Sequence, residues 1–131
     1  MNDFETTIFN NVHSVASPLC AKNRFVSTPI LSYTTLPAAS LYELDNRTVL
    51  AQQSSTPTEN FSRITYQLDV VAATKAECRK IFVAIDERMI QLNFSRVSAN
   101  YITYPDNTKV VRYVARYEAA IDSEGNIYRT Y

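Results

Sequence analysis

Residues 64–70 alternate strictly between apolar and polar side chains. The apolar positions are Ile64, Tyr66, Leu68 and Val70, and the polar positions between them are Thr65, Gln67 and Asp69. A period of two residues predicts a half-buried β-strand whose apolar side faces a core.

A helix is predicted directly after this strand. Thr74 suits the N-cap position, and Glu77 stands three residues later, where a capping box requires an acidic or amide side chain. Apolar residues then recur in steps of three and four at Cys78, Ile81, Phe82, Ile85, Met89 and Leu92. This spacing indicates an amphipathic helix, and its apolar stripe needs a sheet to pack on.

Similar patterns predict the other elements. Residues 3–17 form a first helix capped by Asn2 or Asp3, and residues 25–36 form an extended connector. Further strands are predicted over residues 38–44, 94–104 and 109–121, the last two joined as a hairpin, with a short final strand over residues 126–129. Gly125 precedes that strand, where a turn with positive φ is expected.

Residues 46–60 are polar and contain one proline. A structureless loop of this length is uncommon in a domain unless it has a function, so a protruding binding loop is one interpretation. The other is a short hairpin strand at Val49 and Leu50, and the pattern favours neither.

The order of these elements predicts a single α+β domain over residues 1–131. We expect an antiparallel or mixed sheet of about four strands with two helices packed on one face.

Composition excludes several classes of function. Thirteen basic and thirteen acidic residues cancel, so no net charge attracts nucleic acid or an anionic membrane. The single glycine rules out a glycine-rich phosphate-binding loop. We expect no signal peptide, no membrane-spanning segment, and two free thiols in a reducing compartment, Cys20 and Cys78.

No pattern in the sequence indicates catalysis. His13 lacks a nearby nucleophile with an orienting partner, and one histidine with two distant cysteines does not give the spacing of a zinc site. Asp69, Asp86, Glu87 and Glu118 are expected on solvated surfaces. We therefore predict that the chain is not an enzyme and needs no cofactor or metal.

Tyrosine and arginine supply the candidates for contact. Among the nine tyrosines, Tyr66, Tyr101, Tyr113 and Tyr117 are predicted in the core, whereas Tyr104, Tyr128 and Tyr131 lie at turns or at the end of the chain. Arg112, Arg116 and Glu118 share the polar side of their strand. They are either ordinary exposed residues or a charged seam, meaning a line of charged side chains between copies in a ring.

The layout resembles small neck proteins of long-tailed bacteriophages and prophages, namely tail-terminator (tail-completion) and head-tail joining proteins. The resemblance covers most of residues 3–129 and rests on loose strand motifs: LPAASLYELDN (36–46), ENFSRITYQLDV (59–70), RYVARYEAAID (112–122) and IYR (127–129).

The resemblance implies a structural virion protein, made in the bacterial cytoplasm and located in the tail or neck. Six copies would form a hexameric ring that ends the tail tube and joins it to the head. Its partners would be itself, the tail tube protein and the head-tail connector proteins, with passive contact to DNA passing through the channel and none to membrane. The residues expected at these interfaces are Arg112, Arg116, Glu118, Arg47, Gln52, Gln53, Tyr128 and Arg129.

Three alternatives stay open at this point. One is a head-side connector of the neck. Another is a small ferredoxin-like enzyme with a pocket between sheet and helices. The third is an adaptor that adds a strand to a partner's sheet through the 109–121 edge or the terminal strand.

Overall fold

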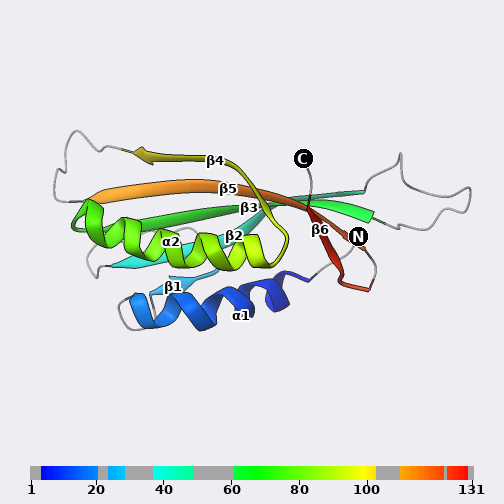
Figure 1. Ribbon diagram of the computed structural model, residues 1–131, viewed down its shortest axis with the longest axis horizontal. Coiled ribbons are helices and arrows are strands. Elements are labelled where there is room, and N and C mark those ends of the chain that lie inside the picture. The colour runs from blue at the N-terminus through cyan, green and yellow to red at the C-terminus, as the bar shows by residue number, and fades with distance from the viewer. Residues whose placement is uncertain are drawn as a thin grey trace, which may run out of the picture.

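The computed structural model describes residues 4–20, 24–28, 37–48, 61–102, 110–122 and 124–129. Two α-helices pack on a mixed sheet of six strands, an α+β arrangement as predicted (Figure 1). In chain order the elements are α1 (Glu5–Ala16), the 3₁₀-helix η1 (Ser17–Leu19), β1 (Phe25–Val26), β2 (Ala38–Thr48), β3 (Phe61–Ala72), α2 (Lys75–Gln91), β4 (Ser95–Ile102), β5 (Val111–Asp122) and β6 (Ile127–Arg129).

The strand order is β1-β2-β3-β5-β4, and β6 pairs with β5. Among the described strands, β1 and β2 pair in parallel, and the other pairs are antiparallel. Leu68 in the middle of β3 lies opposite Leu41 of β2 and Ala115 of β5. β3 and β5 are therefore interior strands.

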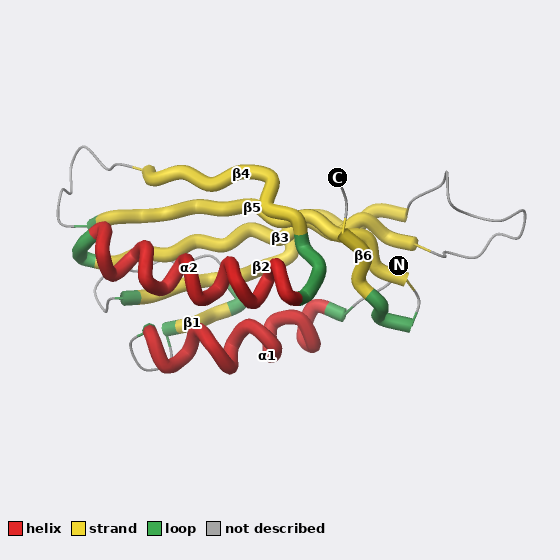
Figure 2. The backbone as a smooth tube through the Cα atoms, viewed as in Figure 1, coloured by secondary structure: helices red, strands yellow, loops and turns green. Residues whose placement is uncertain are grey.

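Both helices lie on the same side of the sheet (Figure 2). Ile8 and Val12 of α1 share one buried cluster with Ile81 and Ile85 of α2. The same cluster holds the alternate strand residues Leu41, Ile64, Tyr66, Leu68, Val70, Ala115, Tyr117, Ala119 and Ile121. We call this side of the sheet the helix face and the other side the open face.

Several local predictions are confirmed. The Thr74 side chain accepts a hydrogen bond from the Glu77 backbone N–H at 3.2 Å, so it caps α2. Gly125 has a φ of +88°, and a Cβ there would lie 3.1 Å from the Phe4 ring. Cys20 and Cys78 are both free thiols.

Other predictions are wrong in extent. The sheet has six strands and not about four, and the two residues of β1 are too few to show an alternation in the sequence. The predicted loop at 46–60 begins too early, because residues 46–48 continue β2 by pairing with residues 62–64 of β3. Residues 49–60, with the rest of that loop, lie outside the described part of the chain. Phe4 stands at the N-cap of α1 without a side-chain hydrogen bond.

Candidate functional site

A hydrogen-bonded polar cluster lies on the open face of the sheet. Asp69 Oδ1 accepts hydrogen bonds from Arg112 Nη2 at 3.1 Å and from Gln67 Nε2 at 3.3 Å. The Tyr42 hydroxyl accepts from Gln67 Nε2 at 2.8 Å and lies 3.4 Å from Asp69 Oδ2, to which it donates. Arg116 Nε donates to Gln67 Oε1 at 3.3 Å. We call these five residues the Asp69 cluster.

The strand order brings the cluster together. Tyr42 lies directly opposite Gln67, which on its other side lies opposite Arg116. Asp69 faces Val114, so Arg112 reaches it from the diagonal position two residues along the strand. Three strands that are distant in the sequence thus supply one network.

Asp69 is 3% exposed and Gln67 is 8% exposed, although neither helix covers this face. The expectation that Asp69 is solvated is therefore wrong. A carboxylate withdrawn from water needs a cation and hydrogen-bond donors, which Arg112, Gln67 and Tyr42 supply. Burial, and then the Asp69 charge, raise the pKa of the Tyr42 hydroxyl above its usual value.

Arg112, Arg116 and Glu118 share the open face, as their spacing predicts. Arg112 forms an ion pair with Asp69, and its side chain is 25% exposed. Arg116 is exposed, and Glu118 is half-buried. Of the predicted seam, Arg116 is the residue most accessible to a partner.

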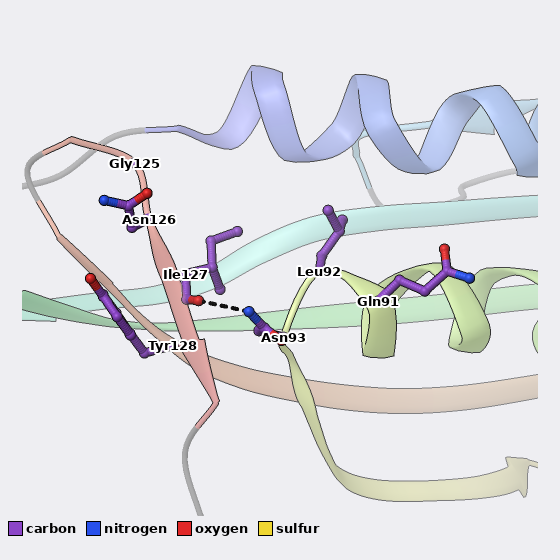
Figure 3. A pocket seen from close by; sticks show the side chains of 7 residues that line it. All are labelled: Gln91, Leu92, Asn93, Gly125, Asn126, Ile127 and Tyr128. Carbon is purple, nitrogen blue, oxygen red and sulfur yellow. Dashed lines mark hydrogen bonds between the residues drawn. The ribbon is translucent and has the colours of Figure 1, made fainter.

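Tyr128 lies elsewhere, in β6 beside the C-terminal end of α2 (Figure 3), and Arg129 follows it in the same strand. Arg129 Nη2 donates to the Ile90 carbonyl at 2.6 Å, which places a cation at the negative end of the helix dipole. The Asn93 amide donates to the Ile127 carbonyl at 3.0 Å, and Asn93 has a φ of 70°. The hydrogen bonds of Arg129 and Asn93 therefore hold β6 against the C-terminal end of α2.

A shallow cleft of about 500 Å³ lies at this junction (Figure 3). Its lining residues are Gln91, Leu92, Asn93, Gly125, Asn126, Ile127 and Tyr128. Beside it, the Tyr128 hydroxyl donates to Asp122 Oδ2 at 3.1 Å. Desolvation acts to raise the pKa of Asp122, but hydrogen bonds from Asn126, Tyr128 and Glu124 together hold it below its usual value. The turn before β6, which lines the cleft, is therefore stabilised by hydrogen bonds from its own residues.

Of the remaining predicted interface residues, the structure describes only the backbone of Arg47. Arg47 belongs to β2, where its backbone pairs with Arg63. Gln52 and Gln53 lie outside the described residues. Their role at an interface stays a prediction.

A cleft that the sequence did not predict lies between α2 and the edge strand β4. Its volume is about 290 Å³, and its lining residues are Arg79, Phe82, Val83, Asp86, Arg96, Tyr101 and Tyr113. The Tyr113 ring lies 4.3 Å from Phe82 and 4.5 Å from Tyr101 between ring centroids. We call this site the α2–β4 cleft.

Two tyrosine predictions change at this cleft. Tyr101 is 38% exposed and Tyr113 is only half-buried, whereas Tyr66 and Tyr117 are fully buried as expected. Because β4 is an edge strand, fewer neighbours cover its helix face. A bulge between Arg96 and Ser98 also breaks the predicted alternation and leaves Val97 58% exposed.

Tyr117 connects this cleft to the core. Its hydroxyl donates to Asp86 Oδ1 at 2.7 Å, and Asp86 Oδ2 lies 3.2 Å from Arg96 Nη1. Burial and the hydrogen bond to Asp86 raise the pKa of Tyr117 far above its usual value. Tyr117 therefore remains a neutral donor, and Asp86 is a partly buried member of a network and not the solvated residue expected.

The described residues offer little catalytic chemistry. His13 is exposed on α1, with its ring 5.9 Å from Phe9 and 5.8 Å from Phe25. The described residues contain no group of three or more His, Cys, Asp or Glu side chains that could hold a metal ion. Burial raises the pKa of both thiols, Cys20 and Cys78, to about 11, which opposes nucleophilic chemistry.

Within the described part of the chain, no helix has the length and apolar composition needed to cross a bilayer. No model of a known protein family matches the sequence, and no curated protein matches it.

Proposed function

We propose that the chain is a structural neck protein of a long-tailed phage or prophage. It forms a ring that ends the tail tube and joins it to the head. The proposal begins from the strand motifs at 36–46, 59–70, 112–122 and 127–129, which resemble those of tail-terminator proteins. In the structure these motifs form or flank β2, β3, β5 and β6 of one sheet.

Two open sheet edges on opposite sides of the molecule carry this proposal. β4 pairs only with β5, and β1 pairs with β2 only at Ala39 and Ser40, so no other described strand lies beyond either edge (Figure 1). A subunit with two different edges can contact one neighbour through each, and repetition by rotation gives a closed ring.

The Asp69 cluster supports the same role. Its internal hydrogen bonds hold the five side chains in one arrangement, and Arg116 at its rim is exposed. A fixed polar surface suits docking to a second protein ring, because little side-chain freedom is lost on contact.

The adaptor alternative requires a strand that can pair with a partner's sheet, and one of its two candidate strands is excluded. The strand predicted over 109–121 is β5, which is paired on both sides and cannot accept a partner strand. The short terminal strand β6 remains an outer strand.

Tail tubes from the same virus test the proposed function. The purified chain is expected to bind tube ends, seen as capped ends by negative-stain electron microscopy, and to stop added tube protein from lengthening them. Binding to the portal side of filled heads, with bare tube ends, would instead favour a head-side connector. Failure to bind either structure would contradict a neck function.

A further inference from the structure

We propose that the α2–β4 cleft binds an acidic segment of a partner protein. An apolar side chain of that segment enters the cleft, and a neighbouring carboxylate pairs with Arg79 and Lys75. The cleft lies between α2 and the helix face of β4, away from the open face and the backbone edges that the proposed ring uses. The inference therefore goes beyond the proposed function.

Aromatic rings form much of the surface of this cleft. The Tyr113 ring packs against both Phe82 and Tyr101, at 4.3 and 4.5 Å between ring centroids. Phe82 is buried and Tyr113 half-buried, so packing holds these rings in place. Tyr101 and Val83 in the same cleft are 38% and 44% exposed. A fixed aromatic surface that remains open to water suits contact with an apolar side chain.

Positive charge borders these rings. Arg79 lines the cleft, and Lys75 Nζ lies 5.3 Å from the centre of the Tyr101 ring. Lys75 is the first residue of α2, where the helix dipole disfavours a cation, and Arg79 follows at a spacing at which like charges repel. Neither cation forms an ion pair with another described residue, whereas Asp86 neutralises Arg96. Two cations are thus available to a carboxylate of another molecule.

The exposed apolar surface continues past the cleft. Val97 follows Arg96 in β4 and is 58% exposed, although it does not line the cleft. Val83, Val97 and Tyr101 are three of the six large apolar side chains that the described residues expose. A small acid held in about 290 Å³ would leave Val97 in water, whereas an extended segment that follows β4 can cover it. This favours a protein segment as the source of the carboxylate.

Selection from a random-peptide library displayed on yeast shows what the purified chain binds. We expect the enriched peptides to carry aspartate or glutamate close to an aromatic or branched aliphatic residue. Enrichment of neutral or basic peptides, or no enrichment above the starting library, would overturn the inference.

An enriched peptide with a fluorescent label then serves as the probe for the cleft. In fluorescence anisotropy, Arg79→Gln should weaken its binding by about fivefold or more, because a charge-assisted hydrogen bond is lost. Lys80→Gln removes the same charge from an exposed position of α2 that does not line the cleft, and should change little. Arg79→Glu should prefer a peptide whose acidic residue is replaced by lysine. Equal effects of Arg79→Gln and Lys80→Gln would overturn the placement in the cleft.

3-Phenylpropionate tests the source of the carboxylate, because it carries the same groups without a peptide. It should bind about tenfold or more weakly than the peptide, since it covers less of the surface. Equal affinity would assign the cleft to a free small acid and overturn the partner segment.

None of these measurements requires tail tubes, so the outcomes separate this inference from the proposed function. Capped tubes from a chain whose cleft binds no acidic peptide would overturn the inference and leave the neck function standing. Peptide binding in the cleft of a chain that never binds tubes would support the inference and contradict the neck function.

Discussion

Asp69 shows how one residue determines the character of a surface. On a sheet face without a helix, an acidic residue at a polar position is expected to point into water. Here it is buried by its cross-strand neighbours and satisfied by Arg112, Gln67 and Tyr42. The part of the open face that the Asp69 cluster forms is consequently held in one arrangement.

Asp69→Asn is expected to lower the free energy of unfolding by about 2 to 3 kcal/mol, because it removes a charged hydrogen-bond partner from Arg112. Urea unfolding followed by circular dichroism measures the change. Glu87→Gln, at an exposed position of α2, is the control and should stay within about 0.5 kcal/mol of the wild type. An equally small effect for Asp69→Asn would show that the cluster adds nothing to stability.

The thiol of Cys78 gives a second prediction at this scale. Its pKa is raised from 9.0 to about 11 by burial, so at pH 8 the folded chain holds far less thiolate than the unfolded chain. Alkylation by iodoacetamide should be about ten- to a hundredfold slower in the native protein than in denaturant. Peptide mapping by mass spectrometry assigns the modified cysteine, and equal rates would contradict the burial of Cys78.

The same shift predicts a pH dependence of stability. A raised pKa means that the folded state keeps a proton that the unfolded state loses. The stabilisation is full below pH 9 and is lost as the pH rises from 9 toward about 11. Replacement of both cysteines by alanine should flatten this part of the profile, and an unchanged profile would assign the fall to other groups.

Among the elements, α2 was predicted most closely. Its cap, apolar stripe and charged side all follow local rules that act within a few residues, and Cys78, Ile81, Ile85 and Met89 are buried as expected. The alternation of residues 64–70 likewise predicted which side of β3 meets the helices.

Strand order could not be predicted from periodicity. Alternation indicates which side of a strand is apolar but not which strand lies beside it, and β5 lies between β3 and β4. The Asp69 cluster depends on that order, since its members come from β2, β3 and β5. The α2–β4 cleft also depends on a bulge, which inverts the expected sides around Val97.

Thr74→Ala tests the start of α2. Loss of the hydrogen bond from the Thr74 hydroxyl to the Glu77 N–H should reduce stability by about 1 kcal/mol. Thr74→Ser keeps a capping oxygen and should cost only a small part of that. Thermal unfolding of the two variants makes the comparison, and equal losses would show that packing by the methyl group is responsible instead.

At the scale of the whole molecule, the helix face contains the core, and neither helix covers the open face. In the proposed ring, the open face and the two sheet edges make the contacts with other proteins. Arg116 belongs to the predicted charged seam and is exposed on the open face.

Arg116→Glu is expected to leave the fold intact, since Arg116 is exposed and its one described hydrogen bond is to Gln67, and to weaken assembly on tail tubes. Circular dichroism checks the fold, and co-sedimentation with tubes measures the assembly. Lys80→Glu changes charge equally on the helix side and serves as the control. Unchanged assembly would remove the open face from the interface.

The mass of the chain in solution, measured by light scattering for the chain alone and then with phage tail tubes, decides whether it forms the proposed ring. We expect a hexamer, or a monomer of which six copies bind each tube end. A stable dimer that ignores the tubes would contradict it.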